Sequence, residues 1–251
     1  MIQKIKIGAV SYLNTKPLIY GFENGMMKEE TEFIFDFPSN IAQQLLTNQI
    51  DVGLVPVAVL PTMKEYHLIS DYCIGCDGAV ASVCLFSDVP LQNIEKILLD
   101  YQSRTSVALL KILLKEHWKI APELISAEKG FEQHIGGTTA GLVIGDRAFK
   151  QIPLFTFNYD LGLAWKDMTG LPFVFAAWVA NKKMPADFLT SFNKATAEGM
   201  KHIDEIVARN KFDAYDLHQY YTRNITYLMD ETKLKGLELF LQKLGKLAIM
   251  V

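Results

Sequence analysis

The sequence has few of the features that mark several large classes of protein. Cysteine is scarce, with three among 251 residues, an odd number that cannot fully pair within one chain and that fits a reducing compartment. The 25 Lys and Arg form no basic run and are outnumbered by 28 Asp and Glu, so a nucleic-acid-binding surface is not expected. No stretch of about 18 apolar residues is free of charge, which excludes a membrane-spanning helix.

Motifs for several catalytic chemistries are also missing. The chain contains no G-x-S-x-G elbow, no G-x-x-x-x-G-K-[ST] or G-x-G-x-x-G phosphate loop, and no H-E-x-x-H zinc motif. Cys73 and Cys76 form a C-x-x-C with Cys84 nearby. A zinc site needs a fourth ligand, and a redox pair needs a helix start after a strand, and neither is evident. We therefore expect buried thiols and predict neither a metal nor a cofactor.

The first residues indicate where the protein works. The segment from Ile2 to Ile7 alternates polar and apolar residues, which is typical of a β-strand. A signal peptide would show a charged start, an apolar run and a small-residue cleavage site. We therefore expect a cytoplasmic protein whose partner is a small molecule, not a membrane or a nucleic acid.

Half of the chain is hydrophobic, enough for a large core, and strand-like segments alternate with helix-like ones. The patterns predict strands over residues 4–10, 32–37, 51–59, 79–87, 96–100, 124–126, 141–144 and 171–181. Helices are predicted over residues 17–22, from a cap at Ser39, over 104–117, over 160–169 and through most of the last third. This alternation indicates an α/β fold.

Two long apolar strands, at 79–87 and 171–181, are placed to carry the chain into a second lobe and back. They predict a discontinuous first lobe (1–86 and 176–251) around an inserted second lobe (87–175), with crossings near Ser87 and Phe175. A cleft between two α/β lobes suits a small-molecule ligand.

Small polar residues gather at the predicted strand ends and helix starts. They are Ser11, Asn14, Ser39, Ser82, Ser103, Arg104, Thr105, Ser106, Gly145, Asp146 and Arg147. Ligands of open α/β sheets bind beyond the carboxyl ends of the strands, where helix starts offer free N–H groups that suit carboxylates or phosphates. The pattern therefore predicts a small anion held by neutral donors.

Each of these residues also has a purely structural interpretation. Ser103 can simply cap a helix, Asn14 can close a turn, and Ser82 can bond a neighbouring carbonyl. Arg104 can pair with Asp146. Four aromatic residues are expected in the core rather than at a ligand: Trp165, Trp178, Tyr220 and Tyr221. Residue-level reasoning thus reaches a two-lobed α/β protein that binds a small anion, without naming a reaction.

Six segments resemble a known family. They are GAVSYLNTKPL at 8–18, DVGLVPVAVLP at 51–61, DGAVASVCLFSD at 77–88, LDYQSRTSVALLKILL at 99–114, LVIGDRAF at 142–149 and YDLGLAWKDMTGLPFVFAAW at 159–178. Together they resemble the chorismate dehydratases of the futalosine route to menaquinone. The resemblance runs from the first strand to about residue 181.

The resemblance implies a periplasmic-binding-protein type II fold with a ligand cleft between two lobes. It implies loss of water from chorismate, giving 3-[(1-carboxyvinyl)oxy]benzoate, without metal or cofactor. Asn14 and Ser82 are then expected to act on the reacting centre. The substrate-binding candidates are Ser11, Ser39, Ser103, Arg104, Thr105, Ser106, Gly145 and Asp146.

Two alternatives remain open at this point. A related family forms 1,4-dihydroxy-6-naphthoate later in the same route, but its first loop resembles Ser-Pro-Cys-Pro-Asn-Asp-Thr, whereas this chain has Ser11-Tyr12-Leu13-Asn14-Thr15. A non-catalytic protein that binds a small anion would share the fold. The proton acceptor is also open: Asp146 is the one acid beside a predicted ligand-facing turn, and the enolpyruvyl carboxylate of the substrate is the other candidate.

Overall fold

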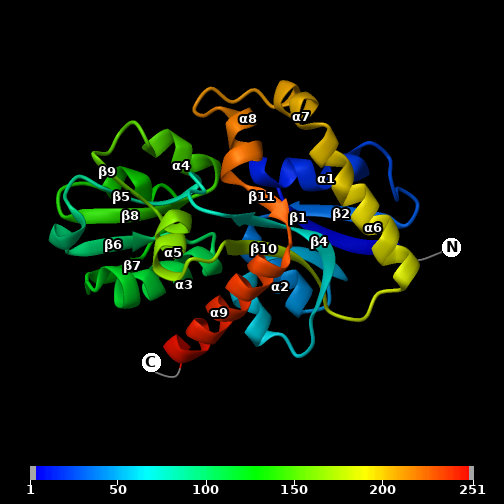
Figure 1. Ribbon diagram of the computed structural model, residues 1–251, viewed down its shortest axis with the longest axis horizontal. Coiled ribbons are helices and arrows are strands. Elements are labelled where there is room, and N and C mark those ends of the chain that lie inside the picture. The colour runs from blue at the N-terminus through cyan, green and yellow to red at the C-terminus, as the bar shows by residue number, and fades with distance from the viewer. Residues whose placement is uncertain (1–3, 249–251) are drawn as a thin grey trace.

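The computed structural model describes residues 4–248, which fold around two β-sheets lying side by side (Figure 1). Within these residues the first sheet has six strands in the order β11-β4-β10-β3-β1-β2, and the second has five in the order β7-β6-β8-β5-β9. Ile2 and Gln3, from the alternating N-terminal segment, lie outside the described residues. The inner strands of both sheets, such as β3, β10, β8 and β5, are almost fully buried, which fits the high apolar content of the chain.

The first sheet begins with two β-α-β units. Strands β1 (Ile5–Val10), β2 (Thr31–Asp36) and β3 (Val52–Pro56) run parallel and are connected by α1 (Lys16–Glu23) and α2 (Pro38–Leu46). The remaining strands, β4 (His67–Cys76), β10 (Phe173–Ala180) and β11 (Thr226–Leu228), complete the sheet in antiparallel pairs. Because parallel strands end at the same edge, the ends of β1 and β3 lie together.

The second sheet repeats this arrangement. Strands β6 (Lys96–Leu99), β7 (Glu123–Ser126) and β8 (Thr139–Ile144) are parallel, with α3 (Arg104–Leu113) after β6 and α4 (Asp146–Gln151) after β8. Strand β5 (Val83–Ser87) pairs antiparallel with β8, and the edge strand β9 (Phe157–Asp160) pairs antiparallel with β5. Helix α5 (Leu161–Thr169) leads back to β10. The ends of β6 and β8 therefore also share an edge.

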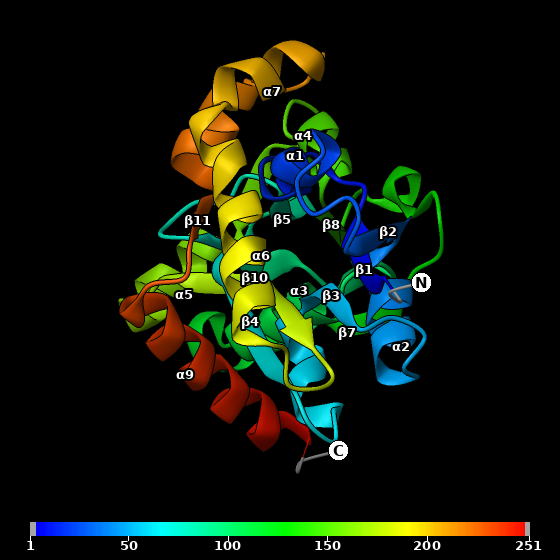
Figure 2. The same cartoon turned by 90° about the vertical axis from the view of Figure 1, so that its right-hand side faces the viewer.

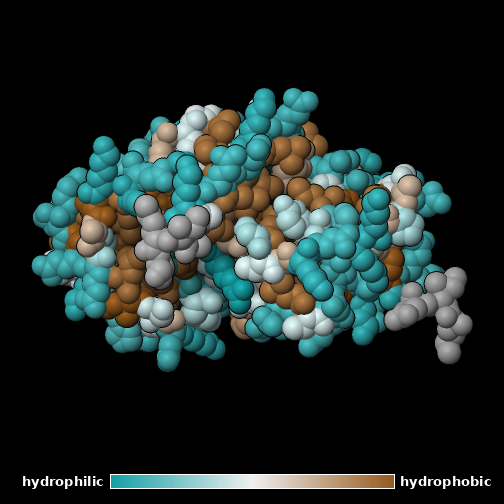
Figure 3. All heavy atoms as spheres, turned by 90° about the horizontal axis from the view of Figure 1, so that it is seen from below, coloured by the Kyte–Doolittle hydropathy of each residue, from teal (hydrophilic) through white to brown (hydrophobic). Residues whose placement is uncertain are grey.

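The C-terminal third wraps around both sheets. Helix α6 (Ala186–Glu198) packs along α1, the short α7 (Ile203–Arg209) and α8 (Leu217–Gln219) follow, and α9 (Glu231–Ala248) runs beneath the junction of the sheets (Figures 1 and 2). Seen from below, hydrophilic residues cover much of the outer face and hydrophobic residues show between them (Figure 3). No helix in residues 4–248 is long and apolar enough to cross a membrane.

Close backbone approach fixes the position of α1. A Cβ atom on Gly21 would lie 2.2 Å from the carbonyl oxygen of Ala195, and one on Gly199 would lie 1.9 Å from that of Pro17. Neither distance is possible for a side chain, so both positions require glycine. The C-terminal helices thereby hold the segment that follows β1, which carries Asn14.

The structure corrects several predicted elements. Ser39 lies inside α2, whose N-cap is Phe37. The strand predicted over 51–59 stops at Pro56 and continues as a 3₁₀ helix, Val57–Thr62, because proline cannot donate to a ladder. Ser82 precedes β5 instead of interrupting it. Strands β4, β9 and β11 were not predicted, since their exposed and half-exposed residues blur the apolar pattern.

The change from one sheet to the other also differs from expectation. Because β5 pairs with β8 and β9, the chain enters the second sheet between Cys76 and Val83, upstream of the crossing predicted at Ser87. It returns between Asp160 and Phe173, ahead of Phe175. The division into a first lobe of residues 1–86 and 176–251 and a second lobe of residues 87–175 stays a prediction. Strand β5, most of which that division assigns to the first lobe, belongs to the second sheet.

Candidate functional site

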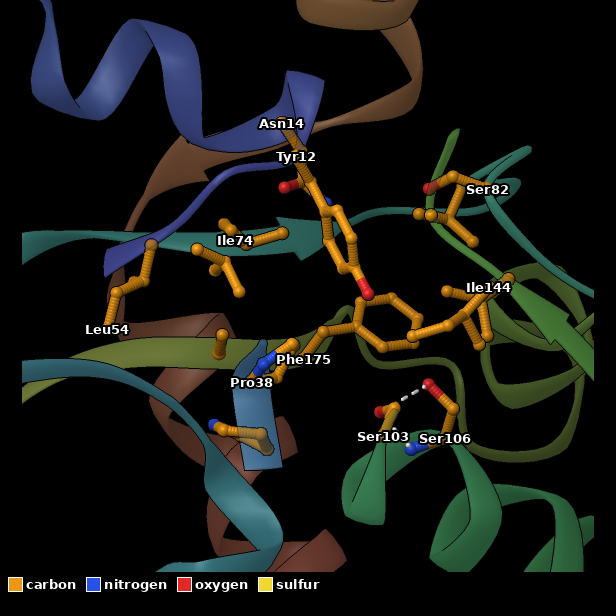
Figure 4. Close-up of a pocket in the computed structure, with 16 residues that line it drawn as sticks. Tyr12, Asn14, Pro38, Leu54, Ile74, Ser82, Ser103, Ser106, Ile144 and Phe175 are labelled. Atoms are coloured by element: carbon orange, nitrogen blue, oxygen red, sulfur yellow. Dashed lines mark hydrogen bonds between the residues drawn. The ribbon is translucent and has the colours of Figure 1, made fainter. Parts of the chain in front are cut away.

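A cavity lies between the two sheets, where their parallel strands end (Figure 4). It is partly open to solvent, and the space not filled by atoms, with the solvent at its mouth included, amounts to about 520 Å³. The first sheet and its loops contribute Val10, Tyr12, Asn14, Pro38, Leu54, Pro56, Ile74, Phe175 and Ala176. The linking segment and the second sheet contribute Val80, Ser82, Val83, Ser103, Ser106, Ile144 and Gly145. The position matches the predicted cleft.

The lining of the cavity is mainly apolar, and its polar groups are neutral. Of its residues, drawn from the described part of the chain, none is Asp, Glu, His, Lys or Arg. Apolar side chains such as Ile74, Val83 and Phe175 form most of the wall, and Asn14, Ser82, Ser103 and Ser106 supply neutral polar groups. Such a site can hold a small ring against apolar walls and direct its polar groups to hydrogen-bond donors.

Asn14 and Ser82 lie in the same cavity although 68 positions separate them in the sequence. Asn14 lies in the 3₁₀ turn Leu13–Thr15 directly after β1, and Ser82 directly precedes β5. The hydroxyl of Tyr220, which is fully buried, donates to Ser82 Oγ at 2.7 Å. The two predicted catalytic residues therefore line one cavity, and Ser82 has a buried partner behind it.

The start of α3 provides the second polar group of the cavity. Ser103 is the N-cap, as predicted, and its Oγ accepts a hydrogen bond from the Ser106 backbone N–H at 3.1 Å. Its hydroxyl also donates to Ser106 Oγ at 3.0 Å (Figure 4). Both side chains are buried, yet they line the cavity. They present hydroxyls at a helix N-terminus, a position that favours an anion.

Other predicted binding residues lie outside the cavity lining. Thr105 Oγ1 accepts a hydrogen bond from the Ala58 N–H at 3.1 Å, which joins α3 to the first sheet's side. Arg104 is exposed and lines a separate groove against α9. Ser11 is exposed and Ser39 is half-buried, and neither lines the cavity. Each of these four residues is the direct sequence neighbour of a residue that does line it.

Gly145 and Asp146 follow β8 and have different roles. Gly145 lines the cavity with φ 63°, a conformation that favours glycine, and its N–H donates to the Ser82 carbonyl at 2.8 Å. The Asp146 carboxylate does not line the cavity and accepts from the Leu13 N–H. Burial raises the pKa of Asp146 to about 6, against the opposing effects of that N–H and of Lys150 and Lys16.

Arg147 has partners that the sequence did not indicate. Its guanidinium donates to Asp100 and Glu132, both at 2.6 Å, and to Gln102 Oε1 at 2.9 Å. Gln102 Oε1 also accepts from the Tyr12 hydroxyl, whose ring reaches into the cavity between Ile74 and Ile144 (Figure 4). This network joins the loop after β1 to the second sheet. The Asp146 carboxylate, which accepts from the Leu13 N–H, forms no ion pair with Arg104 or Arg147 within residues 4–248.

Tyr12, Gln102 and Tyr220 are the functional candidates that residue-level reasoning missed or left in the core, and for Arg147 it missed the partners. Tyr12, Gln102 and Arg147 lie within the segments quoted for the family resemblance, which was the available signal. Tyr220 lies in the C-terminal third, where no motif was recognised, and nothing in the local sequence distinguishes it from a core tyrosine.

The cysteines are buried thiols, as expected. Cys73 and Cys76 lie on β4 rather than between strands, and Cys84 lies on β5. Burial raises the pKa of Cys73 to about 12 and that of the other two well above the ordinary value. No group of three or more His, Cys, Asp or Glu side chains within residues 4–248 is placed to hold a metal ion.

Two mixed sheets with a cavity at their junction define an α/β protein of the periplasmic-binding-protein type II fold. The Candida albicans CA3427 gene product, described as having the generic periplasmic binding protein fold, aligns with a TM-score of 0.63 at 10% identity, over 98% of this chain and 91% of its own. The periplasmic aliphatic sulphonate binding protein SsuA from Escherichia coli gives 0.63 at 13% identity, over 98% and 92%.

The chain belongs to the menaquinone biosynthesis family, whose sequence profile matches residues 5–246. Chorismate dehydratase from Thermus thermophilus is 28% identical, over 95% of this chain and 94% of the relative. Both the family resemblance and the fold class predicted from the sequence are thereby confirmed. The match extends through the C-terminal helices, which the quoted motifs did not reach.

Proposed function

We propose that the protein is a chorismate dehydratase, a carbon–oxygen lyase that acts in menaquinone biosynthesis. The observation that carries the proposal is the cavity itself, in which Asn14, Ser82, Ser103 and Ser106 meet among apolar walls. Membership of the menaquinone biosynthesis family and the similarity to a chorismate dehydratase support it.

The proposed reaction is an elimination from chorismate. The C3–H and C4–O bonds break, a C3–C4 double bond forms, and the proton and hydroxide leave as one water. The product, 3-[(1-carboxyvinyl)oxy]benzoate, has an aromatic ring, which provides the driving force. Negative charge that develops on loss of the C3 proton spreads into the ring carboxylate, so the enzyme has to stabilise that charge and orient the hydroxyl.

Neutral groups are suited to these tasks. Ser103 and Ser106, at the start of α3, would hold one substrate carboxylate by hydrogen bonds and the helix dipole. Phe175, Ile74 and Val83 would enclose the ring and exclude water. Asn14 and Ser82 would donate to the oxygen atoms that gain charge, and in a dry cavity such donors act more strongly than in water.

The proposed proton acceptor is the enolpyruvyl carboxylate of the substrate. The cavity-lining residues of the described chain include no carboxylate and no histidine, and the Asp146 carboxylate is engaged by the Leu13 N–H behind the lining. A substrate that supplies its own base explains why the site is built from neutral side chains. The reaction would then need neither metal nor cofactor and no partner beyond the substrate, and it would take place in the cytoplasm.

The test is to incubate the purified protein with chorismate and follow the products by mass spectrometry. We expect a product lighter than chorismate by one water, with the absorbance of a substituted benzoate. Ser82→Ala is the matched control and should form it far more slowly. Binding of chorismate without turnover would favour a receptor, and naphthoate formation from the later intermediate of the route would favour the related enzyme.

A further inference from the structure

Tyr220 lies directly behind the two residues to which the proposed function assigns catalysis. It begins the π-helical turn Tyr220–Asn224 in the C-terminal third, far in sequence from Asn14 and Ser82. Its side chain is fully buried and does not line the cavity. It contacts the site only through other residues, so any effect on the reaction passes through them.

One hydrogen bond connects Tyr220 to the site. The Tyr220 hydroxyl donates to Ser82 Oγ at 2.7 Å, and Ser82 is one of the polar residues that line the cavity. A hydrogen bond donated to a hydroxyl oxygen polarises that hydroxyl, so the bond from Tyr220 strengthens the next bond that Ser82 itself donates.

Aromatic neighbours fix the ring that carries this hydroxyl. Phe149 packs edge-on against it with ring centroids 4.8 Å apart, Tyr221 lies at 5.6 Å and Tyr215 at 6.3 Å. A fully buried ring held on several sides has no alternative rotamer within reach. The phenol oxygen of Tyr220 is therefore held in one position, and it can orient the more mobile side chain of Ser82.

A serine hydroxyl that accepts from Tyr220 has to direct its own proton elsewhere. Ser82 is 1% exposed and its side chain borders the cavity, so the open side for that proton is toward a ligand. We propose that Tyr220 is a positioning residue, which donates to Ser82 and thereby aims the Ser82 hydroxyl proton into the cavity. For the effect on turnover, this inference rests on the proposed function.

The test compares Tyr220→Phe, Ser82→Ala and the double variant with the wild type. Tyr220→Phe removes only the hydroxyl, and we expect kcat to fall about tenfold or more, with KM changed less, because the donation from Ser82 matters most in the transition state. In the Ser82→Ala background the same change should cost less than about threefold, since residues that act through one another are not additive. Equal losses in both backgrounds would overturn the proposal.

Tyr221→Phe is the matched control. The Tyr221 hydroxyl is buried but has no hydrogen-bond partner within residues 4–248, so its removal should leave kcat unchanged. A crystal structure of Tyr220→Phe gives a readout that does not need turnover. We expect the Ser82 side chain to leave its wild-type rotamer, and an unchanged Ser82 would overturn the proposal. If the wild type does not dehydrate chorismate, the proposed function fails, and the Ser82 rotamer still decides the role of Tyr220.

Discussion

The backbone N–H of Leu13 donates to the carboxylate of Asp146, at 3.2 and 3.3 Å from its two oxygens. This contact joins the turn after β1 to the first turn of α4 and therefore links the two sheets beside the cavity. Asn14 is the next residue along that turn. The Asp146 carboxylate, a predicted ligand-binding group, thus holds the backbone beside Asn14.

Asp146 should make stability depend on pH. Its pKa is raised from 3.8 to about 6, chiefly by burial, so between these pH values the folded chain binds more protons than the unfolded chain. The free energy of unfolding contributed by this group therefore falls as pH rises through that window. At about 1.4 kcal/mol per pH unit the loss approaches about 3 kcal/mol. Asp146→Asn should not show this loss, so its free energy of unfolding should rise relative to that of the wild type as pH rises.

Urea denaturation of both proteins across that pH range measures the difference. Asp167→Asn, on the exposed face of α5, is the control for loss of a negative charge. A stability difference between wild type and Asp146→Asn that does not change with pH would contradict the prediction.

Asn14→Ala and Ser82→Ala should reduce turnover more than binding. Each residue donates to charge that grows during the elimination, and loss of one such donor typically lowers kcat by about 10²–10³. KM should change less, because the interaction strengthens mainly in the transition state. Steady-state kinetics with chorismate tests this. Folded variants with wild-type kcat would remove both residues from the mechanism.

Ser106→Ala and Thr105→Ala should have different effects on KM and on stability, although the two residues are adjacent. Ser106 lines the cavity, so its loss should raise KM for chorismate, since a carboxylate cradle holds substrate and transition state alike. Thr105 Oγ1 accepts from the Ala58 N–H away from the cavity, so its loss should cost about 1 kcal/mol of stability with little change in KM. An equal rise of KM in both variants would refute the distinction.

Arg147→Met should destabilise the protein strongly. The Asp100 side chain is 0% exposed and pairs with Arg147 at 2.6 Å, so the variant leaves a buried carboxylate without its cation. Such losses typically cost about 3–5 kcal/mol. Burial already raises the pKa of Asp100 against the effect of Arg147, so removal of the cation should raise it further.

Two controls identify the cause of that loss. Asp100→Asn together with Arg147→Met should recover part of the stability, since the unpaired charge is gone. The cost of Arg147→Met alone should also shrink at acid pH, where Asp100 takes up a proton. Urea midpoints at pH 5 and pH 8 are the measurement, and a cost below about 1 kcal/mol at both would contradict the prediction.

The sequence was most informative where one residue decides a local structure. Ser103 was expected to cap a helix and does so, and Asn14 lies after β1 in the turn where an α/β sheet meets its ligand. Ser82 was singled out because a hydroxyl among apolar residues needs a partner. The sequence pattern did not show which of several adjacent polar residues lines the cavity. Ser106 lines it, whereas its neighbour Thr105 bonds to the Ala58 N–H.

The contacts that complete the site depend on long-range packing. Tyr220 meets Ser82 across 138 positions of the sequence, and Tyr12 meets Gln102 across 90. Tyr220 has the pattern of a core residue, which it also is, since its ring is fully buried. Its hydroxyl acquires a role only because α6 and the turns after it fold back over the segment that links the sheets.

This return of the chain has a consequence for synthesis on the ribosome. The cavity residues from Val10 to Ala176 are made first, but the phenol behind them and the last strand of the first sheet, Thr226–Leu228, come much later. A growing chain therefore contains every strand of the two sheets except β11 while Ser82 still lacks its partner Tyr220. Competence to bind and turn over a ligand should appear abruptly, only after residue 228 has left the exit tunnel.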